Sequence, residues 1–215
     1  SSEDKKLAFA CINMISAENV SDIPQKVVLP KLFRDNGHMW RATEQILGPS
    51  LDLSLSQKNT KILSYLDSGA KNLCTTKPIT TVGDFKGQKI APYDNSEFSI
   101  DYLSMLGATP KKTAFENVAE ELKAGNLTGV ENSLFQYYSS GNYKYAKNLL
   151  KANYKQCPDI LITNLSMYKS LTNTEQDVIT SAANEACAHQ RENWEQFEND
   201  LEQKLTAEGC KIEAP

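Results

Sequence analysis

The feature that most constrains this fold is a long run of helical spacing near the C-terminus. It opens at Thr172, which has capping-box spacing to Glu175, and it continues until Gly209. Apolar residues recur along it at Ile179, Ala183, Ala186, Trp194, Phe197, Leu201 and Leu205. At 1.5 Å per residue, such a helix is roughly 50 Å long. Because this is long for a compact domain, we expect the helix either to bridge two lobes or to project from one.

Before that helix, short apolar runs alternate with helical patterns, which indicates an α/β protein. Strands or extended pieces are expected at 6–12, 27–30, 61–66, 71–75, 89–91 and 159–163. Helices are expected at 38–47, where Gly48-Pro49 should end the helix, and at 96–107 and 115–123. Thr81 and Asp84 again have capping-box spacing, which predicts a short helical turn.

Composition and charge exclude several classes of function. The chain has 215 residues, 40% of them hydrophobic, with a net charge of −4 and no basic patch, so we do not expect a nucleic-acid partner. No apolar run approaches the roughly 20 residues that span a bilayer. The chain opens with the polar Ser1-Ser2-Glu3-Asp4, which is typical of a processed terminus rather than of a signal peptide.

The reactive side chains show no catalytic or metal-binding arrangement. The five cysteines, Cys11, Cys74, Cys157, Cys187 and Cys210, have no CxxC spacing, and their number is odd. We expect most of them to be small buried hydrophobes. The segment 83–89 lacks P-loop spacing, and no HExxH or EF-hand motif occurs. We therefore expect no enzyme activity, no cofactor and no metal, and we expect both histidines, His38 and His189, to be structural or solvated.

Six short segments and the long helix resemble the solute-binding proteins of TRAP-type (tripartite ATP-independent periplasmic) transporters. The segments are LPKLFRD at 29–35, TKPITT at 76–81, DFKGQKI at 84–90, LGATP at 106–110, AFENV at 114–118 and GVENS at 129–133. Each segment alone is weak evidence for the family, but all of them occur in the family's order and with the family's spacing along the chain. The resemblance covers most of residues 7–215.

The resemblance implies a fold and a mechanism. The fold is that of a type II-like periplasmic binding protein, with two α/β lobes joined by crossing strands and by a long C-terminal helix that spans both. Lobe I would comprise 1–70 and about 158–195, and lobe II would comprise 71–157 and about 196–215. Hinge closure around a small molecule would precede docking on membrane permease subunits, with no chemical step. The protein would work in the periplasm or otherwise outside the cytoplasm, either free or held as a lipoprotein.

The sequence departs from the family pattern in two places. The family carries a strand–helix–strand–helix stretch before Leu7 and a tail beyond Pro215. We therefore expect either a trimmed chain or a first lobe rebuilt with a partner protein that completes it. The family also places an arginine, which pairs with the ligand's carboxylate, where this chain has Ala91. We accordingly predict a ligand other than a simple monocarboxylate.

The resemblance also implies candidate ligand-binding residues, each with a structural alternative. Lys71 stands at a second basic position, although it could be a surface lysine. Asn132 matches a ligand-binding asparagine or forms a turn, and Phe115 lines the cleft floor or packs in the core. The remaining candidates are loop and strand-end positions: Ala91, Tyr93, Asn95, Glu97, Asn13 and Met14.

Two functions stay open from the sequence. The first is capture of a small solute for a transporter. The second is a family-derived sensor or protein-interaction module without a transport role, which the substitution at Ala91 and the absent leading elements favour.

Overall fold

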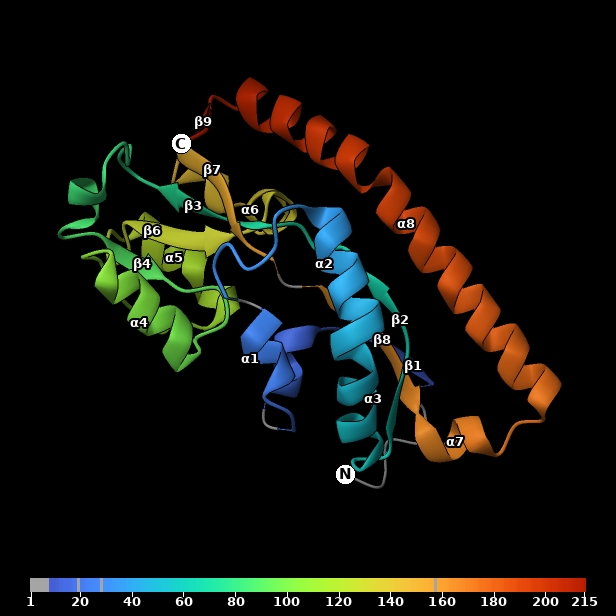
Figure 1. Cartoon of the computed structure of the whole chain (residues 1–215). Helices are drawn as coiled ribbons and strands as arrows, with labels where there is room; N and C mark the ends of the chain where they lie inside the picture. Colours follow the sequence, from blue (N-terminus) through green and yellow to red (C-terminus); the bar gives the residue numbers. More distant parts are fainter. Residues whose placement is uncertain (1–7, 19, 28, 157) are drawn as a thin grey trace. The chain divides into compact units, whose positions relative to one another are not determined.

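The predicted long helix is present as α8, Asn173–Ala207, with 35 residues. It is the longest helix in Figure 1, a computed structural model that describes residues 8–18, 20–27, 29–156 and 158–215. Its capping box forms as predicted. The Thr172 backbone N–H donates to the Glu175 carboxylate at 2.8 Å, and the Glu175 N–H donates to the Thr172 hydroxyl at 3.3 Å. Gly209, with φ +81°, takes the left-handed conformation just beyond the helix end.

Two of the apolar positions expected along α8, Ala186 and Phe197, do not lie on its buried face. Ala183, Cys187, Leu201 and Leu205 are buried, whereas Ala186 is exposed. Successive helical residues are about 100° apart, so the buried Cys187 turns the neighbouring Ala186 away from the core. Within the first part of the helix, the Gln190 side-chain amide accepts from the Asp67 backbone N–H at 3.0 Å and donates to its carbonyl at 2.9 Å.

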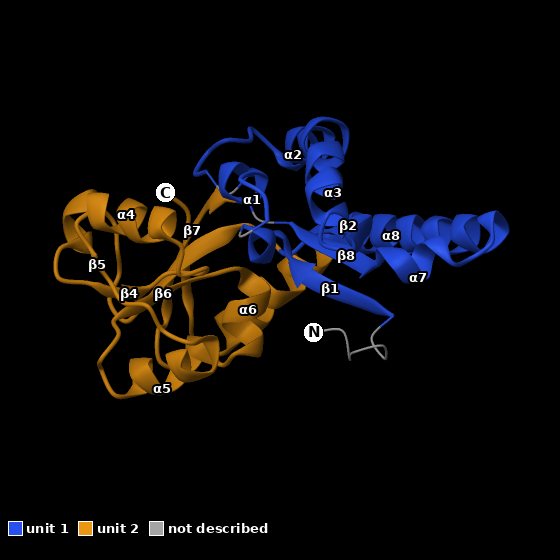
Figure 2. Cartoon of the chain, turned by 90° about the horizontal axis from the view of Figure 1, so that it is seen from below, with its two compact units in different colours: residues 1–68, 156–195 blue, residues 69–155, 196–215 orange. Residues whose placement is uncertain are grey.

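The chain divides into two compact units, coloured separately in Figure 2. Unit 1 comprises residues 1–68 and 156–195, and unit 2 comprises residues 69–155 and 196–215. Helix α8 therefore contributes residues to both units. That the chain forms two lobes that move relative to each other, as the resemblance implies, stays a prediction.

Unit 1 contains a three-stranded antiparallel sheet of order β1-β8-β2. Its strands are β1 (Phe9–Asn13), β8 (Asp159–Asn164) and β2 (Thr60–Leu66). Its helical elements before α8 are η1 (Met14–Ala17), α1 (Ile23–Val27), α2 (Asn36–Ala42), η2 (Thr43–Leu47), α3 (Gly48–Ser56) and α7 (Leu165–Lys169). The core gathers apolar side chains from sheet and helices, among them Met14, Val27, Leu51, Leu55 and Ile160.

Two local predictions in unit 1 were wrong. The extended piece expected at 27–30 is not formed at its start, because Val27 ends α1 and is fully buried in the core, while Val28 lies outside the described residues. The helical stop expected at Gly48-Pro49 is instead the start of α3. Proline is tolerated in the first turn of a helix, where its missing N–H needs no partner. A Cβ at Gly48 would lie 2.3 Å from the Tyr65 hydroxyl, so this glycine permits a close approach to β2.

Unit 2 contains a six-stranded mixed sheet of order β5-β4-β6-β3-β7-β9. The strands are β3 (Lys71–Thr75), β4 (Lys89–Ala91), β5 (Thr109–Pro110), β6 (Gly129–Asn132), β7 (Asn148–Lys155) and β9 (Lys211–Glu213). β4 runs parallel to β5 and β6, β3 runs antiparallel to β6 and β7, and β9 runs parallel to β7. The predicted strands at 61–66, 71–75, 89–91 and 159–163 are therefore present, within a residue at either end.

Helices cover both faces of the unit 2 sheet, which gives the unit two apolar cores. The helical elements are η3 (Val82–Phe85), α4 (Glu97–Met105), η4 (Phe115–Asn117), α5 (Val118–Lys123), α6 (Leu134–Ser139) and η5 (Asn142–Lys144). Figure 2 shows α4 on one side of β4 and β6, with α5 and α6 on the other. Leu103 of α4 packs in one core, and Leu122 and Leu134 pack in the other. Within the described ranges, no helix is long and apolar enough to cross a bilayer.

Candidate functional site

Charged side chains are buried together at one edge of the unit 2 sheet. β4 and β6 are parallel, so their carboxyl ends share an edge, and the antiparallel β3 starts there while β7 ends there. Lys71 opens β3 and is 0% exposed, and Lys155 closes β7 with a side chain that is 2% exposed. The side chains of Asp94, just after β4, and Glu131, in β6, are 0% and 1% exposed. We call these four residues the buried charge cluster.

Lys155 links the two carboxylates of the buried charge cluster. Its ammonium lies 2.8 Å from a Glu131 carboxylate oxygen and 3.2 Å from an Asp94 carboxylate oxygen. It also donates to the Ser99 hydroxyl of α4 at 2.9 Å. An ammonium group has three N–H donors, and these three acceptors match that number. The two buried carboxylates and the buried ammonium therefore compensate one another.

Glu131 joins Lys155 to two tyrosines. The Tyr154 hydroxyl donates to the same carboxylate oxygen as Lys155, at 2.6 Å. The other oxygen accepts from the Tyr93 backbone N–H at 2.8 Å. Burial raises the pKa of Tyr154 well above its ordinary value, and the neighbouring Glu131 charge adds to this. Tyr154 thus stays a hydrogen-bond donor, and its ring stacks on Tyr102 at 5.4 Å between centroids.

Asp94 keeps its charge through its neighbours. Burial alone would push its pKa upward, but the Lys155 ammonium and hydrogen bonds from Ser96 and Ser99 outweigh burial and leave the pKa below its ordinary value. The Ser96 backbone N–H donates to the carboxylate at 3.0 Å. The same Ser96 caps α4, as predicted, because its hydroxyl accepts from the Ser99 N–H.

A backbone irregularity in β7 directs Tyr154 and Lys155 toward this cluster. Leu73 pairs with Leu150, but two residues earlier Lys71 pairs with Lys155, so β7 carries extra residues between the two pairs. Asn153 takes a left-handed conformation with φ 44°, and its N–H donates to the Asn72 side chain at 2.8 Å. Such bulges re-aim side chains that would otherwise alternate across a strand.

Lys71 and Tyr93 lie against each other. The Lys71 ammonium is 4.1 Å from the centroid of the Tyr93 ring, and the Lys155 ammonium is 5.8 Å from it. Lys71 also donates to the Gly69 carbonyl at 3.1 Å. The alternative of a solvated surface lysine is wrong, because Lys71 is fully buried.

Asn132 ends β6 at the same edge and is 3% exposed. Its register partner is Asn72, the neighbour of Lys71 in β3. The Asn142 side-chain amide donates to the side-chain amide oxygen of Asn132 at 3.0 Å. Because this bond occupies the acceptor end of Asn132, the amide is oriented with its N–H donors on the other side. Lys71, Tyr93 and Asn132 are thus three predicted binding residues that the structure brings to one edge.

The other predicted residues of unit 2 lie elsewhere or serve the local fold. Ala91 is fully buried and packs in a core with Cys74 and Val130. Asn95 takes φ 54° and exchanges side-chain hydrogen bonds with the Thr113 backbone. Glu97 is exposed and pairs with Lys112 at 2.8 Å. Phe115 is 58% exposed rather than packed in the core.

In unit 1, the two predicted binding residues lie where β1 ends and η1 begins. Asn13 caps η1 through its side chain, which accepts from the Ile15 N–H, and it donates to Asp159 at 2.8 Å. Met14 is 1% exposed and belongs to the unit 1 core. Their ligand-binding role stays a prediction, as does that of the unit 2 candidates.

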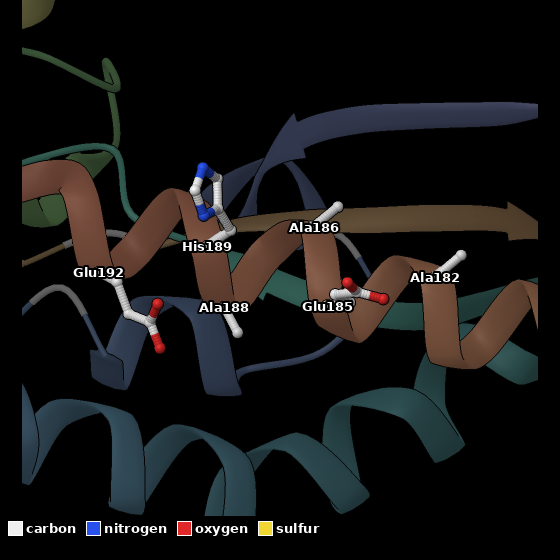
Figure 3. Close-up of a pocket in the computed structure, with 6 residues that line it drawn as sticks. All are labelled: Ala182, Glu185, Ala186, Ala188, His189 and Glu192. Atoms are coloured by element: carbon white, nitrogen blue, oxygen red, sulfur yellow. The ribbon is translucent and has the colours of Figure 1, made fainter.

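The surface hollow along α8 lacks the features of a binding site. Ala182, Glu185, Ala186, Ala188, His189 and Glu192 line it, all from this one helix. Figure 3 shows these side chains pointing in different directions, with His189 and Glu192 on opposite sides of the helix. Ligand pockets need a few polar groups that converge. Within the part of the chain that the structure describes, no three His, Cys, Asp or Glu side chains gather as a metal site.

Comparison with known proteins identifies the chain's family. The family described as bacterial extracellular solute-binding protein, family 7, matches residues 5–215. The chain belongs to this family. A solute-binding protein of Chromohalobacter salexigens is 28% identical over 207 residues, which are 96% of this chain and 61% of that relative. The chain thus spans less than two thirds of the relative's length.

Solved structures of TRAP periplasmic solute-binding proteins have the same fold. One from Xanthobacter autotrophicus, with bound β-D-galacturonate, is 27% identical with a TM-score of 0.88, over 97% of this chain and 70% of that one. One from Chromohalobacter salexigens, with bound D-glucuronate, is 27% identical with a TM-score of 0.89, over 98% and 70%. The predicted family and the α/β fold with a long C-terminal helix are confirmed.

Sequence reasoning did not single out Asp94, Glu131 or Lys155, which the structure places in the buried charge cluster. Glu131 lies inside the quoted GVENS segment, so its position beside Asn132 was an available signal. Lys155 gave no signal, because a lysine ending a polar strand in NYKQ has the pattern of a solvated residue. The irregular pairing of β7 with β3 brings it beside Glu131 and Asp94, where it is buried.

Proposed function

We propose that this chain is the solute-binding component of a TRAP-type transporter and that it binds a small acidic sugar. The family match and the relatives whose structures hold galacturonate and glucuronate support this. The observation that carries the proposal is the buried Lys71 ammonium, which lies where the resemblance implies a basic ligand contact. A buried cation at a strand edge attracts a carboxylate more strongly than an exposed one does.

The chemistry around Lys71 favours a hydroxylated acid over a simple monocarboxylate. With Ala91 in place of arginine, the carboxylate would meet a lysine, which is a point charge without a planar fork of donors. Orientation must then come from other contacts. Asn132, held by Asn142 with its donors directed away from that bond, and the Tyr93 ring supply polar and stacking contacts that suit sugar hydroxyls and a sugar face.

The role we propose for the whole protein is delivery rather than chemistry. The relatives named above are solute-binding proteins, and the solved ones are named as periplasmic. We accordingly place this chain in the periplasm, with membrane permease subunits as its partners and no reaction of its own. No comparison supports the alternative of a sensor or protein-interaction module. A lipoprotein anchor and a partner that completes unit 1 stay predictions.

Thermal unfolding with candidate solutes tests this function. We expect D-glucuronate or D-galacturonate at about 100 times its dissociation constant to stabilise the protein by about 2.7 kcal/mol. Propionate, which carries the carboxylate without the hydroxyls, and glucose, which carries hydroxyls without the charge, serve as matched controls. A protein that no acidic sugar stabilises, or that responds equally to propionate, would contradict the proposal.

A further inference from the structure

Lys71 and Lys155 are direct register partners on β3 and β7, and both ammonium groups are buried. Like charges directly opposite each other on neighbouring strands destabilise a sheet. Burial strengthens that repulsion, because the effective dielectric constant falls. Repulsion between these two ammonium groups therefore lowers the stability of the sheet unless neighbouring groups offset it.

Three acceptors compensate the Lys155 ammonium. Glu131, Asp94 and the Ser99 hydroxyl accept its three protons at 2.8, 3.2 and 2.9 Å. With three acceptors inside the protein, Lys155 has no proton left to donate to a bound solute. Its effect on a solute must therefore pass through the groups that it holds.

Glu131 connects Lys155 to Lys71 through Tyr93. One of its oxygens accepts from Lys155 and Tyr154, and the other accepts from the backbone N–H of Tyr93. The Tyr93 ring lies 4.1 Å from the Lys71 ammonium. A continuous line of contacts thus runs from Lys155 through Glu131 and Tyr93 to Lys71.

We propose that Lys155 is a positioning residue for the solute site, which balances the charges of Glu131 and Asp94, so that Glu131 can hold Tyr93 against Lys71 and neither carboxylate repels an anionic solute. This inference rests on the function proposed above. Without the Lys155 ammonium, two buried carboxylates would remain beside the single ammonium of Lys71. At neutral pH the site would then bind an anion more weakly, and anion binding would recover when a carboxylate takes up a proton.

The titratable groups around Lys155 come from every neighbouring element of unit 2. They are Asp94 after β4, Glu131 of β6, Lys71 of β3, Tyr154 of β7, Tyr102 of α4 and Tyr93. Burial raises the pKa values of Tyr102 and Tyr154, so neither ionises near neutral pH. Once Lys155 is removed, burial raises the pKa of Asp94 without the ammonium that opposed it, so Asp94 is the group that we expect to take up a proton as the pH falls toward 5.5.

Calorimetric titration of the Lys155→Met variant with D-glucuronate tests this proposal. It is carried out at pH 8 and at pH 5.5. We expect the wild-type dissociation constant to change less than about threefold between the two pH values. In the variant, the dissociation constant should rise at least about tenfold at pH 8 and should return most of the way to the wild-type value at pH 5.5. The double variant Lys155→Met/Asp94→Asn, which restores the charge balance, should bind within a few-fold of wild type at both pH values.

Equal losses at both pH values, or no loss at either, would overturn the inference. If Lys155→Met does not fold, Asp94→Asn alone decides it, because removing one carboxylate should tighten glucuronate binding. Unchanged or weaker binding by Asp94→Asn would then count against it.

Amide hydrogen exchange at Tyr93 tests the same line of contacts without any solute. We expect exchange at least about tenfold faster in Lys155→Met, or in Glu131→Gln if the former does not fold, because the Tyr93 N–H loses its fixed acceptor. Unchanged protection would overturn the inference. A wild-type protein that binds no acidic sugar but shows this exchange result would defeat the proposed function alone.

Discussion

The Asn142 side chain donates a hydrogen bond to the side-chain amide oxygen of Asn132 at 3.0 Å, and both residues are almost completely buried. Replacing Asn142 by Leu leaves the Asn132 oxygen buried without this donor, which costs about 1–3 kcal/mol of stability. It also frees the Asn132 amide to rotate, so we expect about tenfold weaker binding of D-glucuronate.

Calorimetric titration and thermal unfolding of Asn142→Leu measure the two effects. Asn132→Ala is the matched control, because it removes the amide that Asn142 holds. Combining both changes should add little to the loss of affinity caused by Asn132→Ala. Fully additive losses would show that Asn142 does not act through Asn132.

Gly129 opens β6 where a side chain has no room. A Cβ there would lie 2.8 Å from the Thr75 methyl carbon and 3.1 Å from the Cys74 carbonyl oxygen. We expect Gly129→Ala to destabilise the protein by about 1–3 kcal/mol in urea unfolding. Gly83→Ala, where the nearest contact would be an ordinary 3.6 Å, should change stability by less than about 0.5 kcal/mol.

Trimming the neighbour tests whether the contact is the cause. Thr75→Ser removes the methyl and keeps the hydroxyl that donates to the Lys77 carbonyl at 2.6 Å. In the Thr75→Ser background, Gly129→Ala should therefore cost less than it does in wild type. An equal cost in both backgrounds would be evidence against crowding.

Asp84 should make stability depend on pH below neutrality. Backbone N–H groups of Thr80 and Thr81, followed by their hydroxyls, lower its pKa from 3.8 to about 2. Because the folded pKa lies below the unfolded one, this contribution is fully present above about pH 4 and is lost as the pH falls toward 2. Asp84→Asn should thus lower the unfolding temperature at pH 7, with a difference that narrows toward pH 2.5.

Thermal unfolding of the variant and wild type between pH 7 and pH 2.5 measures this. Asp101→Asn, on the exposed face of α4, controls for removal of a negative charge. A difference for Asp84→Asn that stays constant over the whole range would show that ionisation of Asp84 does not stabilise the fold.

The orientation of α8 can be tested with two alanines three residues apart. Ala183 is 7% exposed, so Ala183→Leu overpacks the unit 1 side and should cost about 1–3 kcal/mol. Ala186→Leu adds the same atoms on the exposed side and should change stability by less than about 0.5 kcal/mol. Urea unfolding compares them, and a reversed order would mean that the helix presents a different face to the core.

Some of this structure is visible in the sequence because local chemistry decides it. The Thr172–Glu175 capping box, the terminal Gly209 and the apolar repeat of α8 are all local signals, and strands such as 159–163 read directly as apolar runs. Gly48 was misread because its role depends on Tyr65, which is distant in the chain. A glycine that ends a helix and one that permits a close approach look alike in sequence.

The residues of the candidate site also differ in whether the sequence reveals them. Asn132 was singled out because it belongs to a segment that resembles a family, and Lys71 because it stands just before another such segment, at 76–81. Lys155 was not found, because its burial depends on an irregular strand pairing and on carboxylates from β6 and from the loop after β4. Buried charge compensation is a property of tertiary contacts, and a single sequence does not reveal it.

The central claim is that the buried Lys71 ammonium receives the carboxylate of an acidic sugar. Calorimetric titration of D-glucuronate into wild type and Lys71→Met, whose side chain is of similar length and uncharged, tests it most directly. The account predicts binding by wild type and a loss of at least about a hundredfold in the folded variant. Equal binding by both proteins would contradict it.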